Sequence, residues 1–159
     1  MIHYPFTKLD DLSFEFITTQ GTVYKAYFIA YAYLFSDYPE FAKDIYSFNL
    51  EIVTEGLPNQ IPDDKIGQTV AVIFQHFLNS RHNVAVYICD SSDDRHLARK
   101  RKFDFWFWKY DDGSILKEDG LAVIAGMEIY NSILLHKQNP FADKIIAAFK
   151  TLNERADGK

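Results

Sequence analysis

Alternating hydrophobic and polar positions in the first third of the chain predict three strands. From Ser13 to Thr19, phenylalanines alternate with polar residues, which is the period of a half-buried strand. Gln20-Gly21 supplies a turn, and the chain from Thr22 to Phe35 is rich in strand formers with apolar residues on both parities. We therefore expect a hairpin whose second strand is covered on both faces. Alternation resumes from Ile45 to Val53, the third predicted strand.

The pattern of a helix is clearest from Asp63 or Asp64 to Asn79, where apolar residues three and four positions apart form one continuous face. Asp63 suits the cap position because its carboxylate can accept from the free amides of the first turn. The near-continuous apolar run from Asn83 to Cys89 then predicts an interior strand. Since a helix joins this strand to the one before it, the two are expected to pair in parallel through a right-handed crossover.

The next segment, which ends near Lys109, combines basic and aromatic residues and permits two structures. Arg95, Arg99 and Lys102 share one face of a helix, whereas the alternation of Phe103, Phe105 and Phe107 is also typical of a strand. We favour a helix, with Ser92 or Asp93 as its cap.

The rest of the chain predicts two strands and a last helix. The strands cover Ala122 to Ala125 and Glu128 to His136, and the helix starts with Asn139 as cap and Pro140 at its first position. Three strands before the first helix favour hairpins, so the expected fold is a single α+β domain over residues 1–159. It has a mixed, mostly antiparallel sheet and about three helices.

Composition narrows the classes of protein that fit. The net charge of -5 opposes general nucleic-acid binding, so nucleic acid is an unlikely partner. A single cysteine excludes an internal disulfide, and no apolar run is long enough to span a bilayer. The first residues have neither a basic start nor an apolar run, so we expect no signal peptide. These features predict a cytoplasmic protein without a membrane partner.

The layout from about Ser13 to His136 resembles the GNAT acyltransferase superfamily, in which acyl-coenzyme A binds where a central strand splays from its parallel neighbour. In that family the turn before the central helix binds the pyrophosphate, and here the matching stretch is Pro62 to Thr69, with Gly67 at a glycine of the pattern. The resemblance implies an acyl-CoA site at Lys65, Gly67, Gln68 and Thr69. It also implies a carboxylate base on the third strand, for which Glu51 or Glu55 are the candidates; the alternative is that Glu51 only faces solvent.

The chain is also similar to an uncharacterised family of small bacterial proteins. The residues that carry this likeness are Tyr87-Ile88-Cys89-Asp90, Asp94-Arg95, Arg99, Arg101, Phe103, Trp106 and Phe107. This second resemblance implies no activity.

The residues from Asp90 to Lys102 form a candidate site for a ligand or partner, because ligands often bind at the carboxyl ends of interior strands. Asp90, Asp93 and Asp94 are suited either to hold a magnesium ion or to cap the helix and pair with Arg95 and Arg99. The two arginines, one helical turn apart, are suited to bind a phosphate group as a fork. Lys102 extends the same face. Cys89 precedes acidic residues, which are expected to raise the pKa of its thiol and to disfavour a nucleophilic role.

Two functions follow from these patterns. The first is a GNAT-like domain that binds acyl-CoA or another phosphate-bearing ligand. The alternative is a non-catalytic interaction or regulatory module that uses residues 95–108 to contact an acidic protein or nucleic acid.

Overall fold

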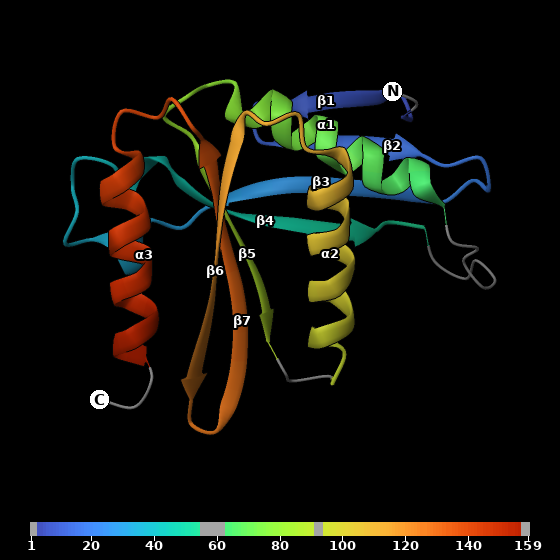
Figure 1. Ribbon diagram of the computed structural model, residues 1–159. Coiled ribbons are helices and arrows are strands. Elements are labelled where there is room, and N and C mark those ends of the chain that lie inside the picture. Colours follow the sequence, from blue (N-terminus) through green and yellow to red (C-terminus); the bar gives the residue numbers. More distant parts are fainter. Residues whose placement is uncertain (1–2, 55–62, 91–93, 157–159) are drawn as a thin grey trace.

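The computed structural model describes residues 3–54, 63–90 and 94–156, which form a seven-stranded sheet with three α-helices. The sheet order is β1-β2-β3-β4-β5-β7-β6, and all neighbouring strands are antiparallel except β4 and β5 (Figure 1). The α+β prediction is therefore confirmed. The strands are β1 (Phe6–Asp10), β2 (Ser13–Ile17), β3 (Val23–Ala30), β4 (Ile45–Ile52), β5 (Val84–Asp90), β6 (Ile115–Ile124) and β7 (Met127–His136). The helices are α1 (Asp64–Leu78), α2 (His96–Tyr110) and α3 (Ala142–Ala156), with short 3-10 helices η1 (Ala32–Phe35) and η2 (Ala42–Asp44).

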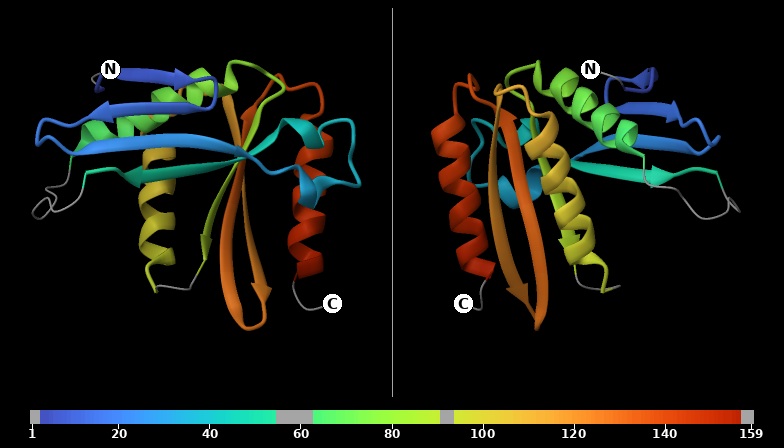
Figure 2. Two further views of the ribbon diagram at one scale, coloured as in Figure 1. Left: turned by 180° about the vertical axis from the view of Figure 1, so that it is seen from behind. Right: turned by 45° about the vertical axis from the view of Figure 1, so that its right-hand side comes forward.

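Strands β4 and β5 pair in parallel, as predicted, but only over their first three residues. Their pairs are Ile45 with Val84, Tyr46 with Ala85 and Ser47 with Val86. Beyond these pairs β4 stays bonded to β3, while β5 follows β7 to its end. The two strands therefore diverge and divide the sheet into two halves (Figures 1 and 2).

Each face of the sheet has its own hydrophobic core. On one face, which we call the α1–α2 face, side chains of β2 to β5 pack against α1 and α2, with Phe28 stacked on Phe77 at 3.7 Å between ring centroids. On the other, the α3 face, β5 and β7 pack against α3 and the chain around η1 and η2, where Phe35 and Ile145 are buried. The half formed by β5, β7 and β6 lies between α2 and α3 (Figure 2).

Two expectations about the first strands are wrong. The predicted strand from Thr22 to Phe35 ends at Ala30, because the chain then turns through η1 and buries Phe35 in the core of the α3 face. β3 is also covered on one face only: Tyr24, Ala26 and Phe28 are buried while Ile29 is half exposed. Strand β1 was not predicted at all, and β6 begins at Ile115 rather than at residue 122.

The helix predictions hold with small shifts. The carboxylate of Asp63 accepts from the Lys65 amide at 2.9 Å, so this predicted cap is confirmed. The Asn139 side-chain oxygen accepts from the Phe141 amide at 2.8 Å, but α3 begins at Ala142, so Pro140 is not at its first position as predicted. Residues 96–110 form a helix, not a strand. Its predicted caps, Ser92 and Asp93, lie outside the described residues. No helix in the described ranges is long and apolar enough to cross a membrane.

Candidate ligand cleft between β4 and β5

The divergence of β4 and β5 opens a cleft of about 510 Å³ that α2 covers from one side. This volume lies within the range of about 300–1,000 Å³ that is typical of small-molecule sites. We call it the basic cleft. Its described lining comes from β3, β4, α1, β5 and α2: Tyr24, Phe48, Asn49, Leu50, Ile52, Ile66, Tyr87, Ile88, Arg95, Ala98, Arg99, Lys102, Phe103 and Trp106.

Three cations are among the described residues that line this cleft, two from α2 and one from its N-cap. Arg95, Arg99 and Lys102 lie at spacings of four and three residues, so they share one helical face, as the sequence predicted. No carboxylate is among the described residues that line the cleft. The first turn of α2 also has no acidic residue, and Arg95 at its N-cap makes no side-chain capping hydrogen bond. The partial positive charge of the helix start therefore adds to that of the cations, and their sum favours an anion.

Aromatic rings form the floor of the basic cleft. Tyr87 stacks on Phe103 with ring centroids 4.1 Å apart, and Phe48 lies 6.3 Å from Phe103. The ammonium group of Lys102 lies 5.5 Å from the Trp106 ring. Burial raises the pKa of Tyr87, with a further contribution from Cys89, so its phenol stays neutral and keeps its proton near neutral pH. The lining of the cleft thus combines three cations with flat apolar surfaces.

The thiol of Cys89 is buried beside this floor. Burial raises its pKa, and interactions with Tyr87 and Arg99 oppose that shift without reversing it. The predicted direction is therefore confirmed, but its main cause is burial rather than the acidic residues that follow in sequence. A neutral, buried thiol is a poor nucleophile.

Comparison with protein families places residues 62–151 in the family described as "Family of unknown function (DUF6169)". The match covers more than half of the chain. The chain belongs to the DUF6169 family. This confirms the expected membership of an uncharacterised family. No curated protein matches the chain. No solved structure matches it.

The DUF6169 match runs from just before α1 to within α3, so it includes the α1, β5 and α2 walls of the basic cleft. All three cations of the cleft lie in it. The β4 wall, with Phe48 and Asn49, lies outside it.

Of the four residues that the sequence predicted for acyl-CoA binding, two are occupied with packing and hydrogen bonds. A Cβ atom on Gly67 would overlap the indole of Trp106, so the glycine lets α2 approach α1. The Thr69 hydroxyl accepts from the Tyr4 amide at 2.8 Å and donates to the Lys65 carbonyl at 2.6 Å. Lys65 is exposed over the Tyr4 ring, and Gln68 is half-buried. None of the four lines the basic cleft, although their neighbour Ile66 does.

The structure places Glu51 away from the basic cleft, and Asp94 is not among the described residues that line it. Glu51 is exposed on the face opposite α1 and α2, where it accepts a hydrogen bond from the Tyr27 hydroxyl at 3.1 Å. Asp94 is exposed, with a φ of 58°, just before α2. Asp90 ends β5 opposite Ile129, and its side chain is outside the described structure. The magnesium alternative needs Asp93, which is not described, so it stays untested. Of the residues predicted for a ligand or partner, the cleft brings together Arg95, Arg99 and Lys102.

A polar network that the sequence did not predict joins α2 to β6 and β7. The Lys117 ammonium lies 2.7 Å from Asp104 and 2.5 Å from Asp119, and the Ser132 hydroxyl donates to Asp119 at 2.6 Å. Lys100 forms an ion pair with Asp104 on the same helix. Burial alone would raise the pKa of Asp119, but hydrogen bonds from Lys117 and Ser132 outweigh it and lower that pKa. Alternation over residues 115–121 would have placed Lys117 and Asp119 on one strand face, but the predicted strand began too late.

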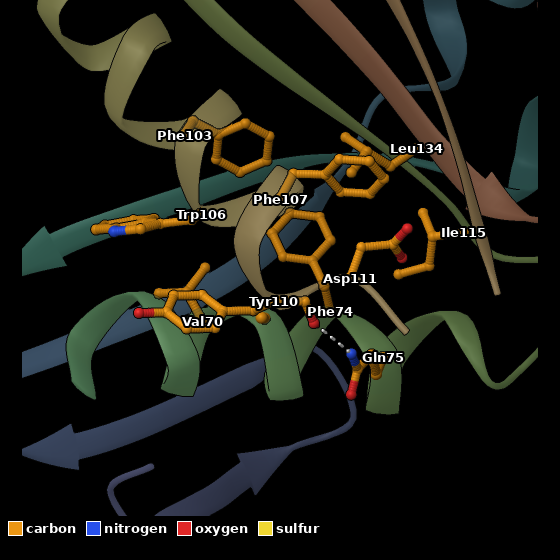
Figure 3. Close-up of a pocket in the computed structure, with 11 residues that line it drawn as sticks. Val70, Phe74, Gln75, Phe103, Trp106, Phe107, Tyr110, Asp111, Ile115 and Leu134 are labelled. Carbon is orange, nitrogen blue, oxygen red and sulfur yellow. Dashed lines mark hydrogen bonds between the residues drawn. The ribbon is translucent and has the colours of Figure 1, made fainter. Parts of the chain in front are cut away.

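A second, much smaller gap lies between α1 and α2 (Figure 3). Trp106, Phe107 and Tyr110 of α2 line it, and the amide of Gln75 donates to the Tyr110 carbonyl at 3.3 Å. Its volume of about 20 Å³ is close to that of one water molecule, and its walls are mostly apolar. We therefore assign it to helix packing.

Proposed function

We propose that the basic cleft binds a small anionic ligand that carries a phosphate group. The observation that carries this proposal is the convergence of Arg95, Arg99 and Lys102 on a cleft of about 510 Å³ whose described lining has no carboxylate. Guanidinium groups bind phosphate oxygens in pairs, and the start of α2 adds favourable backbone polarity. The aromatic floor suits an apolar or planar part of the same molecule.

Acyl-CoA is the specific ligand that we propose first. It carries phosphates and a long thioester arm, and the splay between β4 and β5 supports the GNAT-like layout that the sequence suggested. Because Glu51 lies on the opposite face, the proposal concerns binding and assigns no base for acyl transfer.

The first prediction tests the cations of the cleft. Acetyl-CoA, CoA and inorganic phosphate are added separately, and thermal unfolding and titration calorimetry are measured. A ligand at 100 times its dissociation constant should stabilise the fold by about 2.7 kcal/mol. Arg99→Gln should weaken binding about 10-fold or more, since a hydrogen bond to a charged group contributes about 1.5–3 kcal/mol.

Arg101→Gln is the matched control, because Arg101 is an exposed cation on the same helix that does not line the cleft. This variant should bind like the wild type. If none of the three ligands binds at millimolar concentration, the proposed function is wrong. Equal losses in the Arg99 and Arg101 variants would show a general charge effect and contradict the assigned site.

The exposed face of α2 favours a second candidate function, contact with an acidic protein or nucleic acid. Trp108 is 76% exposed, and Phe105 and Leu97 are also exposed, with Arg101 between them in sequence. Large apolar side chains beside a cation are typical of a contact surface.

The second prediction distinguishes this surface from the basic cleft. If it is the functional one, polyglutamate or single-stranded DNA should change tryptophan fluorescence, and Trp108→Ala should abolish that change. Arg99→Gln should leave it intact. Binding should weaken steeply with salt. An unchanged spectrum with both polyanions at low salt would reject this candidate.

A further inference from the structure

A second cleft, of about 340 Å³, lies on the α3 face of the sheet. Its walls come from η1, β5, β6, β7 and α3 and are mostly apolar, with Leu34, Ile88, Ile124 and Ile129 among them. Leu34 is 42% exposed and Ile124 51% exposed. Apolar side chains left open to solvent around a hollow are typical of a ligand groove. We call this hollow the apolar cleft.

The two clefts share Ile88, which lines both of them. The basic cleft is lined from β4 by Phe48 and Leu50, which pack in the core of the α1–α2 face, and also by Asn49 between them. Because side chains alternate along a strand, Asn49 lies on the α3 face. Residues from both faces of the sheet therefore belong to its lining.

Between the two clefts, β4 and β5 make no ladder pair beyond Ser47 and Val86. In a continuous sheet, hydrogen-bonded strands lie about 4.8 Å apart and leave no passage between them. Past Val86 the strands follow different neighbours, so side chains rather than backbone bonds border the opening. Ile88 stands at this border.

We propose that the ligand is an amphiphilic phosphate ester whose single unbranched apolar tail passes between β4 and β5 into the apolar cleft. This inference rests on the proposed function for the phosphate end. Arg95, Arg99 and Lys102 bind the charged group on the α1–α2 face, and Ile88 contacts the chain as it crosses the sheet. Leu34, Ile124 and Ile129 bury the end of the tail on the α3 face.

A homologous series of n-alkyl phosphates, from methyl to octyl, tests this proposal by titration calorimetry with the full chain. Each methylene that is buried should tighten binding about fourfold, the fold-change that corresponds to about 0.8 kcal/mol. The gain should stop when the tail fills the apolar cleft. The matching n-alkanols, which have no phosphate, should bind far more weakly.

Two variants locate the tail. Ile88→Trp should narrow the space between β4 and β5, so the affinity ratio between octyl phosphate and methyl phosphate should fall toward one. Ile124→Asp puts a charge at the exposed rim of the apolar cleft and should reduce the gain for the longest chains only. Leu97→Asp is the control, because Leu97 is an exposed apolar residue of α2 that lines neither cleft, and it should leave the gain per methylene unchanged.

The outcomes separate this inference from the proposed function. If methyl phosphate and inorganic phosphate bind through Arg99 but affinity does not rise with chain length, the proposed function stands and the tail site is wrong. If the increase in affinity for each added methylene persists in both Ile88→Trp and Ile124→Asp, the tail lies elsewhere and the inference is also wrong. If affinity rises with chain length but Arg99→Gln does not weaken the binding of any alkyl phosphate, the phosphate site itself is wrong.

A last arm distinguishes a dissolved ligand from a membrane lipid. If the protein binds phosphatidic acid vesicles but its affinity for dissolved alkyl phosphates does not depend on chain length, the proposal is overturned in favour of membrane contact. Chain-length dependence in solution supports it.

Discussion

Gly67 and Trp106 show how one residue without a side chain sets the distance between two helices. In the interior of α1 an alanine would ordinarily favour the helix over glycine by up to about 1 kcal/mol. Here an added Cβ would overlap three atoms of the Trp106 indole, a rigid ring packed against the core of the α1–α2 face. Such overpacking costs about 1–3 kcal/mol, so the clash outweighs the gain in helix propensity.

The third prediction follows from that balance. Gly67→Ala should lower the free energy of unfolding, measured by urea denaturation. Gly67→Ala should lower the free energy of unfolding less in the Trp106→Leu background than in the wild type, because the smaller leucine side chain removes the overlap. A more stable Gly67→Ala protein would show that helix propensity decides at this position.

At the scale of elements, α2 is held to the sheet by charges as well as by aromatic rings. Lys117 from β6, with its side chain 9% exposed, contacts Asp104 of α2 and Asp119 of its own strand. Asp104 and Asp119 are more open to solvent, which reduces the energy of both pairs. Even so, a lysine buried to this degree strongly destabilises the fold when its partners are removed.

The fourth prediction concerns this contact and its pH dependence. Lys117→Met should cost about 1–3 kcal/mol of unfolding free energy at neutral pH, because it leaves Asp104 and Asp119 without their shared partner. The folded protein holds the pKa of Asp119 below its ordinary 3.8, so this carboxylate stabilises the fold above about pH 3.8. That contribution is lost as the pH falls through the folded pKa.

Chemical denaturation between pH 2 and pH 7 measures both effects. The wild type should lose stability faster than Lys117→Met as the pH falls below 3.8. Lys144→Met, at another lysine that is exposed on α3, is the control and should follow the wild-type profile. If the unfolding free energies of the wild type and Lys117→Met change in parallel with pH, the assigned role of Asp119 is contradicted.

At the scale of the whole molecule, the separation of β4 and β5 opens the basic cleft, and Ile88 of β5 lines both clefts. One half of the sheet carries α1 and continues to β1, while the other half lies between α2 and α3 (Figure 2). Neither cleft belongs to one element, since their walls come from strands and helices far apart in sequence. The functional proposals therefore depend on this arrangement more than on any single motif.

Several local features were predictable because they depend only on neighbours along the chain. The spacing of apolar residues identified α1, and its cap Asp63 followed from residue type and position. The common face of Arg95, Arg99 and Lys102 followed from the helical period once α2 was assigned. Even the parallel pairing of the strands on either side of α1 followed from their order.

The sequence by itself thus determined the fold class, most of the elements and the three cations of the basic cleft, since each reflects the geometry of a short stretch of chain. Only the tertiary structure decided that β4 bonds to β3 and β5 to β7 beyond their first three pairs, which opens the sheet. It also placed Glu51 on the opposite face and Gly67 against Trp106. These outcomes depend on which distant segments compete for the same backbone bonds and core space, and no local periodicity encodes that competition.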